Sequence, residues 1–536
     1  MNQTPGHVFI VQSDLTRIAC DAWLMPCGAD ARPNRFWLTD VERAPDFPWP
    51  LPPRGWDYDG VRAYKLRPRV LGADGALRPA PWLVNVGGGF ATDVSWFVDG
   101  VREFLARVAD DPDIHPPNVG RTRPLVALPL VGTGYGGARQ RAGEIVRALL
   151  PILYQGARTH RFDVALVIKD AVDYAAAQKE RRRYHQEGVQ RWPELDTGLR
   201  AQADELARLA SQDELVLFLG SGVSVGAGLP TWGDFLRQLA GDPEQSLELD
   251  WRDMGQLGYG DQARILERGF GSKEVMGAAI AQRMYRRNYS LAHALLAAMP
   301  TKQTITTNYD TLFEDASRHI GRMIRTLPYE PVAAGWRWIL KMHGCINHPD
   351  DIVVTREDYM RYAERRNALA GIVQALLLTK HMLFVGFSLE DDNFHRIADD
   401  VRKVVRTTRT SGTPAEPFGT SLVLLDRPFL SQMWDGEIEL ISMQLADHER
   451  PLHRQMAEAA RKLEIFLDYL LAKVHDPHYL LNKRFAHLLS DGEEQLGALL
   501  LELVRQTTPE VRQTPSWPKI AKLLVTLGWN GDLDDP

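Results

Sequence analysis

The sequence predicts an α/β protein built around an open parallel β-sheet, with a second α/β unit before it and helices after it. Five apolar residues, Leu215–Leu219, form a predicted buried strand that leads directly into the glycine-rich segment Gly220–Gly228. Three later apolar strands also end in short polar segments. Beyond them, apolar residues recur at helical spacing. These observations define the expected fold class.

The composition indicates an ordinary globular protein without a strong preference for nucleic acid or membranes. The chain has 536 residues, enough for several domains, with 44% apolar residues, 25% charged residues and a net charge of −6. Three cysteines, Cys20, Cys27 and Cys345, are too few for a disulfide framework or a four-cysteine zinc site. We find no secretory signal pattern and no apolar run of about eighteen residues, so we expect a cytoplasmic protein that does not enter a membrane.

The first region, residues 1–171, reads as a small α/β unit with two glycine loops. Glycines follow two of its strands, at Gly87–Gly89 and at Gly132–Gly137, and a helical pattern follows the second loop. Glycine loops of this kind suit a diphosphate, because main-chain N–H groups can approach it closely. The predicted strands are His7–Val11, Ala22–Met25, Trp82–Val86, Leu125–Val131 and Val164–Ile168.

This region resembles a macrodomain, the ADP-ribose-binding module. The family's Gly-Asp-Ile-Thr segment resembles Gln12–Thr16, and its late phosphate loop resembles Gly132–Gly137. Leu24–Gly28 replaces the family's Val-Asn-Ala-Ala-Asn, so we expect binding of an ADP-ribose-like nucleotide without hydrolysis. The alternative is that the glycines only turn the chain. The resemblance implies that Asp14 faces the adenine and that the loops hold the diphosphate, which gives the candidate residues Asp14, Gly87, Gly88, Gly132, Thr133, Gly134, Tyr135 and Gly136.

Residues 172–212 read as a helical connector, rich in alanine, lysine, glutamate and arginine. The run Arg181–Arg183 is interpreted as a solvated helix face without a function of its own.

In residues 213–428, polar side chains follow the carboxyl ends of successive predicted strands. The segments are Gly220–Trp232, Asn308–Asp310, His343–Gly344 and Gly386–Leu389, and the last strand of this region is predicted at Leu422–Leu425. Ligands bind at the carboxyl ends of strands in open parallel sheets. We therefore expect these segments to converge on one crevice.

Together the segments resemble the Sir2 (sirtuin) fold, a Rossmann-type sheet, and more closely the Sir2-like domains of bacterial antiphage defence proteins that consume NAD. The sirtuin pattern Gly-Ala-Gly-x-Ser corresponds to Gly220–Ser224, and Gln-Asn-Ile-Asp corresponds to Thr307–Asp310. The catalytic His-Gly corresponds to His343–Gly344, and Gly-Thr-Ser-Leu corresponds to Gly386–Leu389. The order of the motifs fits the family, over about residues 213–426.

The resemblance implies an NAD site. Cleaving the bond from nicotinamide to ribose passes through an oxocarbenium-like state, which requires an oriented ribose and a placed water. We assign Asn308 to the ribose or water, His343 to the general base or ribose-hydroxyl partner, and Asp310 to the support of the nicotinamide end. Trp232 would shield that end and Ser388 would contact the adenosine ribose. The expected NAD contacts are Gly220, Ser221, Gly222, Ser224, Pro230, Trp232, Thr307, Gly386, Ser388, Leu389 and Asp426.

Departures from protein deacylases favour NAD hydrolysis. Cys345 is the single cysteine of this region, so we expect no structural zinc and no other metal. The deacylase motif Gly-x-Pro-Asp-Phe-Arg is replaced by Gly228–Gly233. The leading hypothesis is an NAD+ hydrolase that depletes NAD in bacterial antiphage defence. The alternatives are an NAD-dependent protein deacylase and a non-enzymatic NAD or ADP-ribose sensor. The resemblance also implies a homo-oligomer and an activator, either a partner protein or a phage-derived molecule.

Two further expectations concern helices. Residues 261–289 read as a helical insertion over the crevice, and His293 reads as a helix-packing histidine. Residues 429–536 are predicted to be mainly helical, with the clearest pattern at Pro451–Val474.

Overall fold

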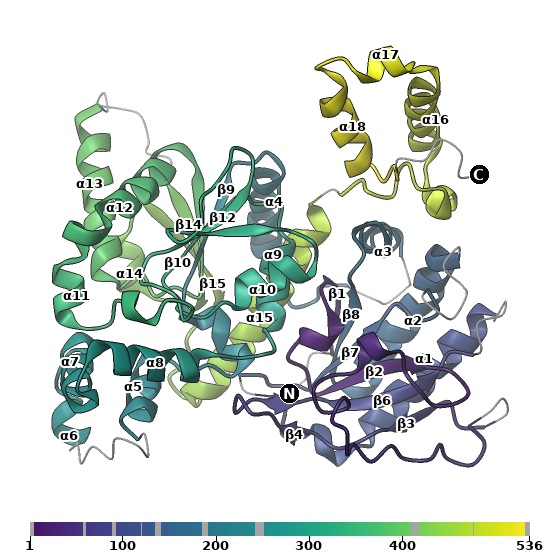
Figure 1. Cartoon of the computed structure of the whole chain (residues 1–536), viewed down its shortest axis with the longest axis horizontal. Coiled ribbons are helices and arrows are strands. Elements are labelled where there is room, and N and C mark those ends of the chain that lie inside the picture. Colours follow the sequence, from purple (N-terminus) through teal and green to yellow (C-terminus); the bar gives the residue numbers. More distant parts are fainter. Residues whose placement is uncertain are drawn as a thin grey trace.

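A computed structural model describes residues 5–56, 60–87, 93–118, 120–133, 141–184, 191–241, 251–408, 417–474 and 476–530. Its described residues contain two large β-sheets flanked by helices and a small two-stranded sheet, followed by a group of helices that projects from the body (Figure 1). The fold class expected from the sequence is confirmed.

The first sheet has six strands in the order β1-β8-β7-β2-β6-β3, and its neighbours are parallel except at β3. All five predicted strands are present; the short β3 and the hairpin β4–β5 were missed. Helices α1 and α2 pack together and cover one face with apolar side chains. The elements are β1 Val8–Gln12, β2 Ala22–Cys27, β3 Ala63–Lys65, β4 Val70–Leu71, β5 Leu77–Arg78, β6 Ala80–Asn85, β7 Leu125–Pro129, β8 Asp163–Ile168, α1 Val94–Ala109, α2 Ala142–His160 and α3 Ala171–Arg183.

The second sheet has seven parallel strands in the order β11-β12-β10-β9-β13-β14-β15. Central β9 lies between β10 and β13, so the chain leaves it in both directions and a crevice opens at its carboxyl end. The prediction that Leu422–Leu425 is the last strand is wrong, because β15 pairs with β14 beyond it. The strands are β9 Leu215–Leu219, β10 Gln303–Thr306, β11 Ile324–Leu327, β12 Arg337–Lys341, β13 His381–Val385, β14 Gly419–Leu425 and β15 Ile438–Gln444.

Helices cover both faces of the second sheet. On one face, α4, α9, α10 and α15 pack together, and the apolar core beneath them continues to the first sheet. On the other face, α12 packs on β13 and against α13, beside α14. The bounds are α4 Thr197–Ser211, α9 Leu291–Ala298, α10 Leu312–His319, α12 Tyr362–Thr379, α13 Asp392–Thr408, α14 Pro428–Met433 and α15 Leu452–Lys473.

Helix α15 joins the two sheets through buried charges. Asp468 is fully buried and accepts hydrogen bonds from Arg181 Nη1 at 2.8 Å and from Trp192 Nε1 at 3.0 Å. His7 Nε2 lies 3.0 Å from the same carboxylate. The expectation that Arg181 lies on a solvated face is therefore wrong: its guanidinium balances a buried carboxylate that would be costly alone.

Helices α5, α7 and α8 form a layer beside the crevice, which confirms the helical prediction for residues 261–289. The terminal helices α16–α18 form a small cluster of their own. No helix of the described chain is both long and apolar enough to cross a membrane. The remaining α-helices are α5 Trp232–Ala240, α6 Trp251–Met254, α7 Tyr259–Phe270, α8 Lys273–Met284, α11 Arg356–Met360, α16 Asp491–Gln506, α17 Pro509–Arg512 and α18 Trp517–Thr526. The 3₁₀ helices of the described residues are η1 Leu15–Arg17, η2 Arg35–Trp37, η3 Pro112–Ile114, η5 Ser221–Ala227, η6 Pro349–Asp351 and η7 Lys483–Leu488.

Candidate active site

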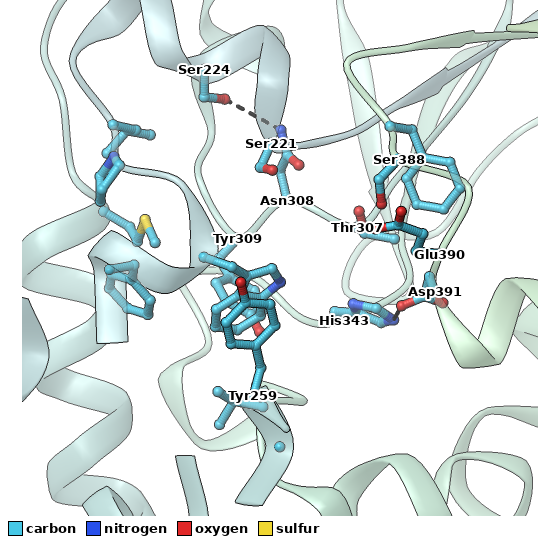
Figure 2. A pocket seen from close by; sticks show the side chains of 18 of the residues that line it. Ser221, Ser224, Tyr259, Thr307, Asn308, Tyr309, His343, Ser388, Glu390 and Asp391 are labelled. Atoms are coloured by element: carbon cyan, nitrogen blue, oxygen red, sulfur yellow. Dashed lines mark hydrogen bonds and ion pairs between the residues drawn. The ribbon is translucent and has the colours of Figure 1, made fainter. Parts of the chain in front are cut away.

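A cavity of about 400 Å³ lies at the carboxyl ends of β9, β10, β12 and β13 (Figure 2). The sheet order brings these loops together although they are far apart in the sequence. Ten of the predicted residues line it: Ser221, Ser224, Pro230, Trp232, Thr307, Asn308, Asp310, His343, Gly386 and Ser388.

The glycines after β9 pack against the loop after β13. A Cβ on Gly220 would lie 2.4 Å from the carbonyl oxygen of Gly386, and one on Gly222 would lie 2.9 Å from its Cα. Gly386 itself has a φ of +66°, which favours glycine. Close packing of two loops therefore requires these glycines, and neither Gly220 nor Gly222 lines the cavity.

Other expectations also differ from the structure. Leu389 is fully buried. Asp426, just after the end of β14, accepts a hydrogen bond from the main-chain N–H of Ala446. Neither Leu389 nor Asp426 lines the cavity. The segment after β9 forms the short 3₁₀ helix Ser221–Ala227.

The side-chain amide of Asn308 is held in one orientation. Its Nδ2 donates to the carbonyl oxygen of Gly220 at 3.0 Å and to Ser224 Oγ at 3.2 Å, which uses both amide hydrogens. A carbonyl oxygen can only accept, so it fixes which end of the amide is nitrogen. Oδ1 of Asn308 is buried and has no partner among the described residues. Asn308 therefore offers an acceptor to a ligand hydroxyl or a water.

Ser224 connects Asn308 to Asp310. Its hydroxyl donates to Asp310 Oδ2 at 2.8 Å, while Asp310 Oδ1 accepts from the N–H of Leu312 at the start of α10. Because both carboxylate oxygens are engaged, Asp310 holds Ser224 and the helix start.

Lys341 supports the same loop from beneath. Its buried ammonium lies 2.9 Å from Glu314 and donates to the main-chain carbonyl oxygens of Asn308, at 3.2 Å, and Asp310. Burial disfavours the charged amine, but the Glu314 carboxylate outweighs burial and raises the Lys341 pKa. The charged lysine thus fixes the turn that carries Asn308.

His343 lies buried in the cavity wall beside a carboxylate. Its Nε2 is 3.5 Å from Asp391 Oδ2 and 3.4 Å from the amide of Asn393 (Figure 2). Burial lowers the His343 pKa, and Asp391 opposes that shift, so the ring is neutral at pH 7. Nε2 faces both Asp391 Oδ2, which accepts a hydrogen, and Asn393 Nδ2, which donates one, so the neutral ring can carry its hydrogen on either nitrogen. A neutral imidazole of this kind can accept a proton.

Aromatic side chains and the α5–α8 layer close one side of the cavity. Trp232 packs edge-on against Tyr309, with ring centroids 5.9 Å apart, and the Tyr309 hydroxyl donates to the carbonyl oxygen of Val353 at 2.6 Å. Exposed Arg356 of α11 pairs with Asp261 of α7, and both Arg356 and the start of α7 lie at the cavity. The layer can shield a ligand from bulk water.

A second cavity, of about 990 Å³, lies in the first unit at the carboxyl ends of its strands. Asp14, Gly87, Gly132 and Thr133 line it as predicted. The Asp14 carboxylate accepts from Lys169 Nζ at 2.8 Å and from Thr16. Burial would raise its pKa, but Lys169 and Thr16 outweigh burial and lower it, so Asp14 is ionised. The other predicted residues, Gly88, Gly134, Tyr135 and Gly136, lie outside the described chain.

The sequence alone assigned no role in the site to four residues that shape the cavity after β9: His293, Asp391, Tyr309 and Lys341. Tyr309 lies within the Thr307–Asp310 motif and Asp391 lies two residues after the Gly386–Leu389 motif, so their positions could have marked them. Lys341 stands between apolar residues just before His343, and a lysine in such an apolar segment is a usable signal. His293 lies on α9, and the sequence carries no signal that relates it to β9.

A family model for a SIR2-like domain matches residues 302–418, which include the Asn308 and His343 loops. Among curated proteins, the NAD(+) hydrolase ThsA of Enterococcus faecium is 31% identical over 202 residues, covering 35% of this chain and 40% of the relative. The ThsA of Bacillus cereus strain MSX-D12 is 27% identical over 198 residues, covering 36% and 40%. Defense-associated sirtuin 2 of Bacillus subtilis is 23% identical over 257 residues, covering 44% of this chain and 25% of the relative.

The predicted resemblance to Sir2-like defence NAD hydrolases is therefore confirmed, with a SIR2-like match over residues 302–418. The chain spans about two fifths of the length of the ThsA relatives that it matches. The macrodomain resemblance of the first unit stays a prediction.

Proposed function

We propose that the chain is an NAD+ hydrolase that cleaves NAD to nicotinamide and ADP-ribose in the cavity after β9. One observation carries the proposal: the cavity joins the acceptor Asn308 Oδ1, which has no partner among the described residues, to the neutral base His343. Hydrolysis at the anomeric carbon needs these two groups, one to orient a hydroxyl and one to take a proton. The names of the relatives support the same reaction.

In this reaction the bond from the ribose C1′ to the nicotinamide nitrogen breaks, and its electron pair leaves with nicotinamide. Water supplies the new C1′–O bond and loses one proton. Asn308 Oδ1 accepts a hydrogen from the water or from a ribose hydroxyl and fixes its direction. His343 takes the proton, and Asp391 stabilises the imidazolium that forms. Trp232 and Tyr309 exclude bulk water from the nicotinamide end.

The remaining predicted contacts form part of the proposal. Ser388 and Thr307 line the cavity near the base of the loops and would hold the adenosine ribose and the diphosphate. We propose no metal in this reaction. Our proposed organisation is a nucleotide-binding unit in residues 1–171, a connector in 172–212, a catalytic region that begins at 213 and includes β15, and helices after it.

The biological role follows from the relatives. A defence-associated sirtuin and several NAD(+) hydrolases resemble the chain, so we propose that it depletes NAD in the cytoplasm during antiphage defence. A homo-oligomer and an activator, from a partner protein or a phage, belong to this proposal.

The cavity of the first unit favours a second role, the binding of an ADP-ribose-like nucleotide. Ser13 lines this cavity, and its hydroxyl lies 2.9 Å from the buried Tyr289 hydroxyl. Tyr289 also exchanges main-chain hydrogen bonds with Arg17 and Ala19. The next residue, Ser290, caps α9, and its hydroxyl lies 3.0 Å from the carbonyl oxygen of Val223 in the loop after β9. We propose that nucleotide binding in the first unit regulates NAD cleavage through this segment.

The test is to incubate the full chain with NAD and to quantify nicotinamide and ADP-ribose over time. Hydrolysis predicts equal amounts of the two products without any acyl-lysine peptide. A deacylase would release nicotinamide only with such a peptide, and a sensor would leave NAD intact.

A further inference from the structure

His293 is a buried histidine of α9 that touches the candidate active site from behind. Only 1% of it is exposed, and its Nε2 lies 3.4 Å from Ser224 Oγ. His293 does not line the cavity itself. The sequence suggested a histidine that only packs a helix, but the contact with Ser224 gives its ring a polar partner.

The helix start fixes the tautomer of this ring. The main-chain N–H of Ser290 points at His293 Nδ1, at 3.3 Å, and a main-chain N–H can only donate. The Ser290 hydroxyl lies 2.8 Å from the same nitrogen and can donate its hydrogen there. Nδ1 must therefore carry the lone pair, and Nε2 must carry the hydrogen that faces Ser224. A doubly protonated ring would set Nδ1–H against the Ser290 N–H.

His293 completes the bonding of Ser224. A hydroxyl has one hydrogen and two lone pairs. Ser224 donates its hydrogen to Asp310 and accepts from Asn308 Nδ2 at 3.2 Å, so His293 Nε2–H fills the second lone pair. With all three positions occupied, the hydroxyl has a single orientation. The Asn308 amide, which depends on Ser224 and Gly220, is then held with Oδ1 free for a ligand.

We propose that His293 is a positioning residue for NAD cleavage: its Nε2–H fixes Ser224, and Ser224 fixes the Asn308 amide. This inference rests on the proposed function, because the group it positions is the acceptor for water or ribose. His293 itself does not touch the substrate. Its loss should therefore slow the chemical step and leave NAD affinity nearly unchanged.

The alternative is a purely structural role, in which His293 only stabilises the start of α9 through its capping box with Ser290. That role uses Nδ1, whereas the positioning role uses Nε2, so substitutions can separate them. Glutamine at position 293 can accept from the Ser290 N–H and also present an N–H toward Ser224. Asparagine can accept from Ser290 but is too short to reach Ser224. Leucine does neither.

The experiment measures kcat and KM for NAD in the full chain and in His293→Gln, His293→Asn and His293→Leu. We expect kcat to fall by about 10- to 100-fold in the Asn and Leu variants and to recover in the Gln variant, with KM within about twofold throughout. His381→Leu is the matched control. His381 is a partly buried histidine that bonds the Thr420 hydroxyl at 2.8 Å, at the amino end of β13, and we expect its variant to keep full kcat.

Thermal unfolding of each variant separates folding from positioning, and His293→Asn decides the question if His293→Leu fails to fold. Equal kcat in the Asn and Gln variants would overturn the proposal. If the wild-type chain cleaves no NAD, the proposed function fails, and the crystal structure of His293→Asn still tests the positioning. We expect a displaced Ser224 hydroxyl and a reoriented Asn308 amide there; unchanged positions of both would refute the inference.

Discussion

Replacing Asn308 by alanine removes the acceptor that we assign to water or ribose and the two donor bonds that hold it. The lost bonds reach the carbonyl oxygen of Gly220 at 3.0 Å and Ser224 Oγ at 3.2 Å. A hydrogen bond contributes about 1 kcal/mol net, so we expect a loss of about 2 kcal/mol in the free energy of unfolding. Domains of this size are stable by about 5–15 kcal/mol, and the variant should remain folded.

The effect on catalysis should be larger than the effect on stability can explain. A positioned catalytic group contributes about a hundredfold or more, which corresponds to about 2.7 kcal/mol in the activation free energy. Asn308→Ala should therefore cleave NAD at about 1% or less of the wild-type rate at saturating NAD. Release of nicotinamide, followed by chromatography, measures this rate.

Asn118→Ala is the matched control. Asn118 lies in the first unit and is also half-buried, and its Nδ2 donates to the carbonyl oxygen of Cys20 at 2.8 Å. It does not line the cavity after β9. Its variant should lose about 1 kcal/mol in stability and retain wild-type turnover. Wild-type turnover by folded Asn308→Ala would refute the assignment of the acceptor.

Four further predictions follow from the charges and cavities. Burial lowers the His343 pKa, so kcat/KM should be constant above about pH 6.5 and fall only at lower pH, as the base becomes protonated. The rate of NAD cleavage by His343→Ala should be about a hundredfold lower than that of the wild type. A wild-type rate that falls as the pH rises from 6 to 8 would contradict the base assignment. Burial also lowers the His293 pKa to about 4, below the unfolded value of about 6.5, so between pH 7 and 5 the unfolded chain binds a proton that the folded chain does not. Over this range the free energy of unfolding of the wild type should fall by about 2 kcal/mol more than that of His293→Gln. Equal losses in urea titrations of the two proteins would argue against this pKa shift. NAD cleavage should survive a strong chelator, and metal analysis that finds one zinc per chain would overturn the metal prediction. The added carboxylate in Thr133→Glu should repel a diphosphate from the first-unit cavity, abolish the heat of ADP-ribose binding and change the regulation of NAD cleavage. If binding and regulation are both unchanged, the first unit is a structural scaffold and not a nucleotide sensor.

The sequence predicts the central strands of both sheets because they are covered on two faces. β9 and β13 are continuous apolar runs for that reason. The edge strands β11 and β15 are only partly buried, and their mixed composition concealed them. Arg181 could not be placed from a charge run, because its buried partner Asp468 lies far away in the sequence.

The candidate site also contains residues that the sequence predicts and residues that it does not. Asn308 and His343 directly follow strands, so the geometry of a parallel sheet brings them together. The roles of the glycines could not be read from the motif, since Gly220 serves the approach of Gly386. His293 depends on the packing of α9 beneath the loop after β9, which no local pattern encodes.

The central claim is that NAD is cleaved between Asn308 and His343 in the cavity after β9. The most direct test is a crystal structure of the Asn308→Ala chain with NAD bound, since this variant should bind NAD but cleave it slowly. We expect the nicotinamide ribose carbon C1′ within about 4 Å of the His343 ring or of a water bonded to it, and the nicotinamide beside Trp232. NAD bound only in the first-unit cavity, or bound here with its C1′ far from both residues, would contradict the account.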